Sequence, residues 1–504
     1  MAIRIFHTFI LMFALVCTPA VAQQRHGAPQ GGEQKSSGDP GVLRLLPPDS
    51  VTEHALQVRG RTLAYTATAG TLNLYQQSGE RSAAVFYTAY VLKGADPATR
   101  PVTFVFNGGP GAASAYLHLG LVGPKILDFG PDARNVGNAQ LRDNPDTWLS
   151  FTDLVLIDPI GTGWSRTAKG TDDGDFMNVR ADASVLAKTI ALYLTHSGRS
   201  GSPKYILGES YGGFRAVKVA RAAWSEQGVV TNGIIMLSPL MEGSFQFGNR
   251  AYALGAALQL PSLAAAELER KHAFTPAALA AAEHFAMTDY LTTLAGPEPE
   301  GEAATAFYAK VAQITGLPVD VVAKARGFIH GAYIKHLRES SREIVSSYDV
   351  TFAAPDPFPE SASESGDDPI LSGVTRAYGG AFANYARNEL GFKTEMTYQL
   401  LSGEVGRKWK WNEGGGRDQV SVSRDLRELL ALNPAFKLMV AHGYSDLVTP
   451  YAISRYVLDH LPKIGAPGRV SLKLYRGGHM LYLDPQSRAA FTADARTFYG
   501  TVSE

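Results

Sequence analysis

Cysteine is almost absent from this chain, because Cys17 is the only one in 504 residues. That scarcity excludes a disulfide-stabilised scaffold and any zinc site built on cysteine. Excess charge of either sign is also absent, since 47 Lys and Arg residues are balanced by 47 Asp and Glu residues. A net charge of zero argues against nucleic acid or an anionic membrane surface as the main partner.

Long apolar runs are missing beyond the first residues, and no later segment has the 18 consecutive apolar residues of a membrane span. The N-terminus itself has the pattern of a signal peptide: Arg4, an apolar run at 9–16, and small residues at Ala20 and Ala22. We predict cleavage after Ala22 and an exported protein, periplasmic or secreted, without a membrane anchor. An uncleaved anchor is the alternative; a lipid attached to Cys17 is disfavoured because Val16 is bulky.

The rest of the chain is rich enough in apolar residues, at 45%, to form a large core. Residues 23–47 are rich in Gly, Gln, Ser and Pro and predict a disordered linker, so that the folded domain covers 48–504. Short β-rich runs with glycine turns at 55–92 predict an antiparallel meander at the edge of a sheet.

An alternation of strands and helices follows the meander. Continuous apolar runs at 102–106, 154–157, 204–207 and 233–237 are typical of strands buried on both faces, and 437–441 and 470–475 add two more strands. Helical stretches at 179–195 and 214–227 separate several of them. The pattern predicts an α/β fold with a mostly parallel central sheet. Residues 241–431 carry few strand signals, and we expect a helical insertion that forms a cap over one end of the sheet.

The segment 208–212 reads G-E-S-Y-G and follows a predicted strand directly before a predicted helix. A G-x-S-x-G match alone could be an inert tight turn, but this setting is the one that a nucleophile elbow requires. The turn is so sharp that side chains at 208 and 212 would clash, and it exposes the hydroxyl of Ser210. We therefore predict Ser210 as the nucleophile.

A serine nucleophile needs a base and an acid, expected in the order Ser, acid, His. His479 follows the strand at 470–475 in a glycine-rich loop and is the predicted base. Asp446 follows the strand at 437–441 and is the predicted acid, which holds the imidazole in the useful tautomer. His442 competes as the base, and Asp484 is the fallback for the acid.

The oxyanion needs donors, and the loop N-G-G-P-G at 107–111 follows the strand at 102–106. We assign one donor to the amide of Gly109 and the other to the amide of Tyr211. A phosphate loop is the alternative, but no Lys-Ser or Lys-Thr follows the glycines. The chain has no H-E-x-x-H motif and no acidic calcium loop, and we predict neither a metal nor a cofactor.

Taken together, these segments resemble the serine carboxypeptidases of the α/β-hydrolase fold, in a secreted bacterial form. The resemblance covers most of residues 54–500. The matching segments are N-G-G-P-G at 107–111, Asn144-Pro145 with Trp148, D-P-I-G-T-G-W-S at 158–165, G-E-S-Y-G-G at 208–213 and G-H-M at 478–480. The resemblance implies removal of the last residue of a peptide or protein through an acyl-enzyme.

The resemblance also implies that Asn107, Gly108 and Glu209 bind the terminal carboxylate of the substrate. A protonated Glu209 could donate a hydrogen bond to that carboxylate, and burial beside an anion would raise its pKa. The chain departs from the family at three positions, with Leu121 for a second glutamate, Val105 for a tryptophan and Ala112 for a cysteine.

We therefore expect an exported serine-type carboxypeptidase that acts on peptide C-termini. Acyltransfer or ester hydrolysis by the same triad is the alternative that Leu121 keeps open. A secreted binding protein on a hydrolase scaffold is a further alternative, disfavoured by the complete triad. Neither the preferred C-terminal residue nor the oligomeric state follows from the sequence.

Overall fold

The structure is a computed structural model that describes residues 41–130, 136–247, 252–363, 366–411 and 415–500. The predicted signal peptide, with Cys17 and Ala22, and most of the predicted linker lie outside these residues. The described chain begins with the 3-10 helix η1 (Gly41–Leu45), whose Leu43 is buried. The described residues therefore include the last part of the predicted linker, at 41–47.

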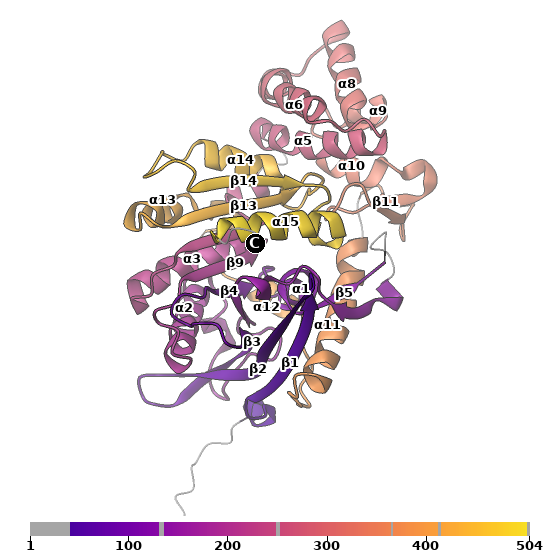
Figure 1. Ribbon diagram of the computed structural model, residues 1–504. Helices are drawn as coiled ribbons and strands as arrows, with labels where there is room; N and C mark the ends of the chain where they lie inside the picture. Colours follow the sequence, from indigo (N-terminus) through magenta and orange to yellow (C-terminus); the bar gives the residue numbers. More distant parts are fainter. Residues whose placement is uncertain (1–40, 131–135, 248–251, 364–365, 412–414, 501–504) are drawn as a thin grey trace, which may run out of the picture. The chain divides into compact units, whose positions relative to one another are not determined.

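Within the described residues, ten strands form one large sheet (Figure 1). The strand order is β1-β2-β3-β7-β4-β9-β10-β13-β14, and β8 pairs with β3. The edge strands β1 to β3 are antiparallel, whereas β7, β4, β9, β10, β13 and β14 are all parallel. The predicted α/β fold with its edge meander is confirmed. The strands span β1 (Ser50–Val58), β2 (Arg61–Tyr75), β3 (Arg81–Leu92), β4 (Val102–Phe106), β7 (Asp153–Ile157), β8 (Arg166–Thr167), β9 (Lys204–Glu209), β10 (Gly233–Leu237), β13 (Lys437–Gly443) and β14 (Val470–Tyr475).

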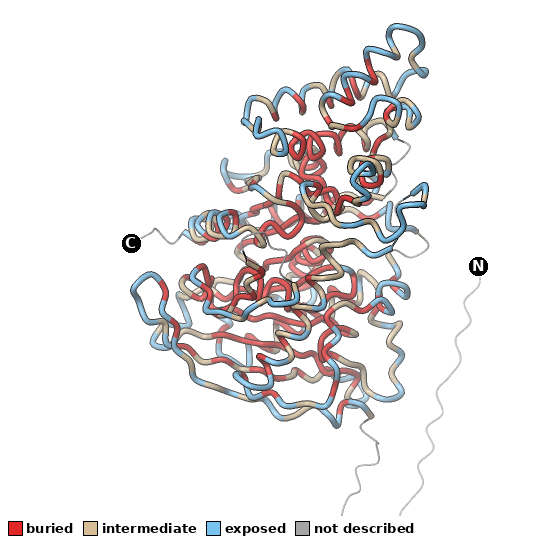
Figure 2. The backbone as a smooth tube through the Cα atoms, turned by 90° about the vertical axis from the view of Figure 1, so that its right-hand side faces the viewer, coloured by how far each residue is buried: buried red, intermediate tan, exposed pale blue. Residues whose placement is uncertain are grey.

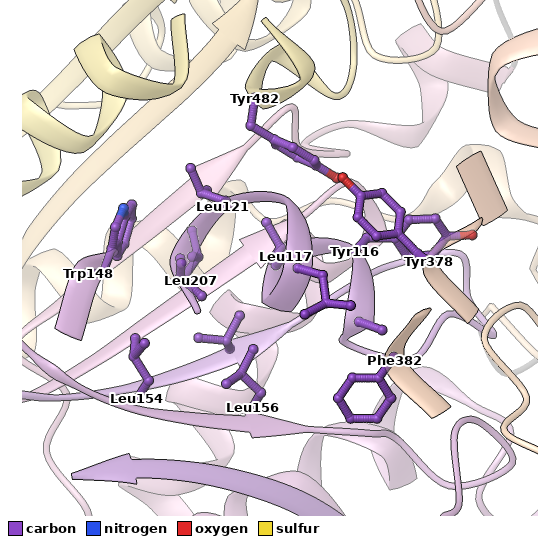
Figure 3. Close-up of a cluster of buried hydrophobic side chains, with 14 of the residues drawn as sticks. Tyr116, Leu117, Leu121, Trp148, Leu154, Leu156, Leu207, Tyr378, Phe382 and Tyr482 are labelled. Carbon is purple, nitrogen blue, oxygen red and sulfur yellow. The ribbon is translucent and has the colours of Figure 1, made fainter. Parts of the chain in front are cut away.

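Helices cover both faces of the sheet because side chains alternate along each strand. Leu154 and Leu156 of β7 face a core shared with η2, α11 and α15, part of which Figure 3 shows. Val155 and Ile157 face the opposite core, shared with α2, α3 and α13. These elements are η2 (His118–Val122), α2 (Val179–His196), α3 (Tyr211–Gln227), α11 (Pro369–Asn388), α13 (Ser423–Leu432) and α15 (Pro485–Phe498).

Shorter elements connect these layers. They are α1 (Ala115–Leu117), β5 (Lys125–Asp128), η3 (Val136–Asn138), β6 (Gln140–Asp143), η4 (Trp148–Ser150), η5 (Asp173–Asp175), α4 (Gly243–Phe247), α12 (Gly403–Lys408), η9 (Arg417–Gln419), α14 (Tyr451–Asp459) and η10 (Leu481–Leu483).

The first part of the predicted insertion is mainly helical and is called the cap below. Its elements are α5 (Ala253–Arg270), α6 (Pro276–Phe285), η7 (Ala286–Tyr290), α7 (Leu291–Ala295), α8 (Gly301–Thr315), α9 (Val319–Lys324), α10 (His330–His336), η8 (Glu339–Ser341) and the hairpin β11 (Glu343–Val345) and β12 (Ala353–Pro355). These elements enclose a core of their own, and α5 packs on α14. Figure 2 shows buried residues inside the cap and exposed residues on its outer turns.

The second part of the insertion returns to the sheet. Helix α11 begins at a side-chain cap from Asp368, which accepts the amides of Ile370 and Leu371. Its Val374, Tyr378, Phe382 and Tyr385 belong to the core under the sheet and not to the cap core. The predicted insertion of 241–431 is thus divided between the cap and a helix that packs on the sheet.

Candidate active site

Ser210 occupies the sharp turn between β9 and α3, with a φ angle of 62° and a ψ angle of −127°. This backbone conformation is strained for a residue with a side chain. A methyl group added at Gly208 would lie 1.9 Å from the carbonyl oxygen of Gly212, and one added at Gly212 would lie 2.6 Å from that of Phe106. Both glycines are therefore required by the close approach of the chain, and the turn exposes Ser210 at the carboxyl edge of the sheet.

Asp446 lies in the loop after β13 and is completely buried. Its Oδ1 accepts the amides of Val448 at 2.8 Å and Thr449 at 2.9 Å. Its Oδ2 accepts Nδ1–H of His479 at 2.9 Å and also lies 2.7 Å from the hydroxyl of Thr449. These contacts hold a carboxylate in a fixed orientation against the imidazole.

His479 lies in the loop after β14, and its backbone amide donates to the carbonyl of Tyr348 at 2.6 Å. Because Nδ1–H donates to Asp446, Nε2 is the nitrogen that can accept a proton from Ser210. Burial alone would lower the pKa of His479, but the negative charges of Asp446, Glu209 and Asp368 and the hydrogen bond to Asp446 raise it above 6.5.

Ser210 and His479 line one cavity of about 150 Å³. Asn107, Gly109 and Glu209 line the same cavity. Among the described residues, His479 forms side-chain hydrogen bonds only through Nδ1, and its Nε2 and the Ser210 hydroxyl are not yet joined by one. Catalytic hydrogen bonds of this kind often close only when the substrate binds. The structure thus brings the three predicted triad residues, distant in sequence, to one edge of the sheet.

The loop 107–111 lies against the first turn of α3. A methyl group added at Gly108 would lie 2.6 Å from the amide nitrogen of Tyr211, so the loop can approach only without a side chain there. Gly109 has a φ angle of 98°, which also favours glycine. The amides of Gly109 and Tyr211 both belong to residues that line the cavity. Tyr211 is the first residue of α3, where backbone N–H groups have no partner within the helix.

Glu209 is buried directly before the nucleophile. Asn107 donates Nδ2–H to its Oε2 at 2.5 Å, and the hydroxyl of Tyr482 lies 3.1 Å from both carboxyl oxygens. Burial raises the pKa of Glu209 to about 7, although His479, Tyr482 and Asn107 act in the opposite direction. The side chain is thus close to half-protonated at neutral pH and faces the cavity beside Ser210.

The two alternatives for the triad have structural roles instead. Nε2 of His442 hydrogen-bonds with the hydroxyl of Ser454 at 2.8 Å, and burial lowers the pKa of His442 to about 4. Asp484 caps α15 by accepting the amide of Ser487 at 2.9 Å.

Three residues of the site have no signal in the sequence pattern. Thr449 contacts Asp446 and lies 3.0 Å from Nδ1 of His479 and 2.9 Å from the carbonyl oxygen of Ser238. The ring of Tyr348, in the cap hairpin, packs edge-on against the imidazole of His479 with centroids 5.1 Å apart. Tyr482 contacts Glu209.

A metal site can be sought among the described residues, and no group of three or more His, Cys, Asp or Glu side chains there could hold an ion. The residues that line the cavity include Ser210, His479 and Glu209.

Comparison with known proteins adds to this geometry. Residues 63–239, which include the loop at 107–111 and Ser210, match the serine carboxypeptidase family. This part of the chain is similar to the serine carboxypeptidases. Serine carboxypeptidase 24 of Arabidopsis thaliana is 26% identical over 198 residues, which cover 38% of this chain and 40% of that protein. Serine carboxypeptidase-like 34 of the same plant is 28% identical over 158 residues, 30% of this chain and 29% of that protein.

The matched segments thus span less than half the length of these curated relatives, and Asp446 and His479 lie outside the family match. Among solved structures, the prohormone-processing carboxypeptidase Kex1(delta)p from Saccharomyces cerevisiae aligns with a TM-score of 0.53. It is 14% identical, and the alignment covers 92% of this chain and 94% of that one. The chain has the α/β-hydrolase fold.

Proposed function

We propose that the protein is a serine-type carboxypeptidase that removes the C-terminal residue of peptides. The observation that carries the proposal is Glu209, a buried carboxyl group that directly precedes Ser210 and is hydrogen-bonded to Asn107 in the same cavity. A neutral carboxyl group can donate a hydrogen bond to a substrate carboxylate, whereas an ionised one would repel it. Such a group beside the nucleophile selects the end of a peptide.

In the proposed reaction, Oγ of Ser210 bonds to the carbonyl carbon of the last peptide bond while Nε2 of His479 takes the hydroxyl proton. The amides of Gly109 and Tyr211 stabilise the oxyanion, each by about 3–4 kcal/mol in the transition state. His479 then gives its proton to the leaving amine, and the C–N bond breaks. Water, deprotonated by the same nitrogen, attacks the acyl-enzyme. The bond between the acyl carbon and Oγ of Ser210 then breaks, His479 returns the proton to Oγ, and the shortened peptide is released.

The test is digestion of a mixed peptide library followed by mass analysis, with Ser210→Ala as the inactive control. The expected products have lost single residues from the carboxyl end, and the same peptides with amidated C-termini are cleaved far more slowly. Internal cleavage, or hydrolysis of esters without any cleavage of peptides, would contradict the proposal. Labelling of Ser210 by a fluorophosphonate separates an enzyme from a binding protein on the same scaffold.

Ester hydrolysis or acyltransfer is the second candidate, and Leu121 favours it. This residue is apolar and fully buried at the position where the resemblance leads us to expect a second glutamate. With one carboxyl group fewer, the cavity would bind a substrate carboxylate less strongly. A ratio of kcat/KM that favours blocked amino-acid esters over blocked dipeptides at every pH would support this candidate.

Export is part of the proposal and rests on the leader at residues 1–22. In the ranges that the structure describes, no helix is both long and apolar enough to cross a membrane. N-terminal sequencing of the protein recovered outside the cytoplasm should begin at Gln23, and recovery of an intact Met1 would contradict cleavage after Ala22.

A further inference from the structure

The side-chain amide of Asn107 contacts Glu209 and can only donate a hydrogen bond to it. Oδ1 of Asn107 accepts the amide of Leu117 at 3.0 Å, and this contact fixes the side-chain amide so that Nδ2 faces Oε2 of Glu209. An amide nitrogen does not accept a proton. When Glu209 is neutral, its proton is therefore carried by Oε1, and that hydrogen needs an acceptor.

Tyr482 supplies the second contact. Its hydroxyl lies 3.1 Å from Oε1, and the side chain is buried. The residue belongs to η10 and follows His479 by three positions, so one loop carries both the proposed base and the contact to Glu209. A phenol oxygen can accept a hydrogen bond and donate one at the same time.

The fold makes room for this tyrosine at Gly120 in η2. A methyl group added at Gly120 would lie 2.5 Å from Cε2 of Tyr482 and 2.7 Å from the hydroxyl of Tyr378. Figure 3 shows the two tyrosines directed toward one another in the cluster that also contains Leu121. Leu121 is apolar and cannot bond a carboxyl group, whereas the hydroxyl of Tyr482, from the same cluster, contacts that of Glu209.

We propose that Tyr482 is a specificity-determining residue that positions Glu209 to recognise a free terminal carboxylate, an inference that rests on the proposed function. In the empty site, neutral Glu209 donates Oε1–H to the phenol oxygen. When a substrate carboxylate enters, Glu209 donates to the substrate, and the phenol O–H turns to donate to Glu209. No proton is gained or lost in this exchange. A phenylalanine in place of Tyr482 could take part in neither arrangement.

Several titratable groups face Glu209 and shape its pH dependence. They are His479 and Asp446 of the catalytic loops, Tyr482 of η10, Tyr116 of α1, Tyr348 of the cap hairpin and Tyr378 of α11. Among them, the Tyr482 hydroxyl lowers the pKa of Glu209 by donating to its ionised form. Loss of this hydroxyl should therefore move the ionisation of Glu209 to higher pH.

The test compares Tyr482→Phe with Tyr385→Phe on a blocked dipeptide and a blocked amino-acid ester between pH 5 and 9. Tyr385→Phe also removes a buried tyrosine hydroxyl, one that accepts from Tyr90 at 3.1 Å. We expect Tyr482→Phe to lower the dipeptide-to-ester ratio of kcat/KM about tenfold, through a higher KM for the dipeptide. The alkaline limb of the dipeptide profile should also move to higher pH. Tyr385→Phe should change neither the dipeptide-to-ester ratio nor the position of the alkaline limb.

A double-mutant cycle tests whether Tyr482 acts through Glu209. In a Glu209→Gln background, Tyr482→Phe should change the ratio by less than about twofold. The full effect in that background, or an unchanged ratio for Tyr482→Phe alone, would overturn the inference. If Tyr482→Phe does not fold, 3-fluorotyrosine at position 482 keeps the ring and is a stronger donor. It should move the alkaline limb to lower pH, and an unmoved limb would overturn the inference.

The outcomes also separate this inference from the proposed function. If the wild-type protein hydrolyses the dipeptide and Tyr482→Phe has the same dipeptide-to-ester ratio of kcat/KM, only the role of Tyr482 is overturned, and the proposed function stands. A wild-type protein that hydrolyses the ester but never the dipeptide overturns the proposed function, and the inference with it.

Discussion

Two buried carboxyl groups face His479 from different regions, and they are held in opposite ways. Asp446, in the loop after β13, is surrounded by four donors, two backbone amides, a hydroxyl and an imidazole. Within the described part of the chain, the carboxyl group of Glu209, at the end of β9, has side-chain hydrogen bonds only with Asn107 and Tyr482, and burial raises its pKa to about 7. Two carboxyl groups with similar burial therefore differ mainly in the supply of donors.

The difference suits two different tasks. A charge that is fully hydrogen-bonded can stabilise an imidazolium without taking up a proton. A carboxyl group with few donors stays neutral more easily and can give a hydrogen bond to an anion. The predictions below exchange or remove the groups that create this difference.

The largest effect is expected for Asp446→Asn. The amide of an asparagine would donate toward Nδ1 of His479, favour the wrong tautomer and leave Nε2 protonated. We expect kcat to fall about 10⁴-fold for peptide and ester alike. Asp484→Asn is the matched control, since asparagine also caps helices well and residue 484 only caps α15. An Asp446→Asn variant within about tenfold of wild type would show that the donor set of Asp446 is not what sustains catalysis.

The positions of Ser210, Asp446 and His479 at one edge of the sheet could be predicted from the sequence, because they follow from local rules. The run at 102–106 matches β4 residue for residue, and the loops after β9, β13 and β14 meet because parallel strands end at one edge of the sheet. The glycines around Ser210 are needed for steric reasons that the motif itself implies.

The sequence does not predict the supporting contacts, because they depend on packing between distant segments. Tyr348 reaches His479 from the cap hairpin, and Tyr482 reaches Glu209 across the space left by Gly120. Helix α11 has a readable apolar face with Val374, Tyr378, Phe382 and Tyr385, but periodicity does not say which core that face joins. The predicted insertion therefore included α11, although the helix packs in the core beside the sheet.

The second-largest effect is the loss of dipeptide hydrolysis at alkaline pH, as Glu209 ionises. Above pH 7 the neutral fraction of Glu209 should fall about tenfold per pH unit, because its pKa lies at about 7. We expect kcat/KM for a blocked dipeptide to fall accordingly, while that for a blocked ester persists. Both substrates should lose activity at acidic pH, where His479 becomes protonated, and this limb should lie above 6.5. Parallel profiles for the two substrates above pH 7 would remove Glu209 from carboxylate recognition.

A smaller effect is expected for Thr449→Val, which removes one of the four donors of Asp446 without changing the shape of the side chain. The hydroxyl also lies 2.9 Å from the carbonyl oxygen of Ser238, a second acceptor for its one hydrogen. We expect kcat to fall about tenfold with KM unchanged, and Thr449→Ser to retain most of the activity. Equal kinetics for the valine and serine variants would mean that the hydroxyl group has no part in holding the triad.

The smallest expected effect is a change in the pKa of His479, which the charges of both carboxyl groups raise. The negative charge of Glu209 helps to raise the pKa of His479, and Glu209→Gln removes that charge while keeping the shape of the side chain. The acid limb of ester hydrolysis should therefore move to lower pH in this variant. The limb set by Asp446 alone remains, because its charge and hydrogen bond also raise the pKa of His479. A limb that stays in place would mean that Glu209 is already neutral throughout the range in which His479 titrates, which would sharpen the contrast between the two carboxyl groups.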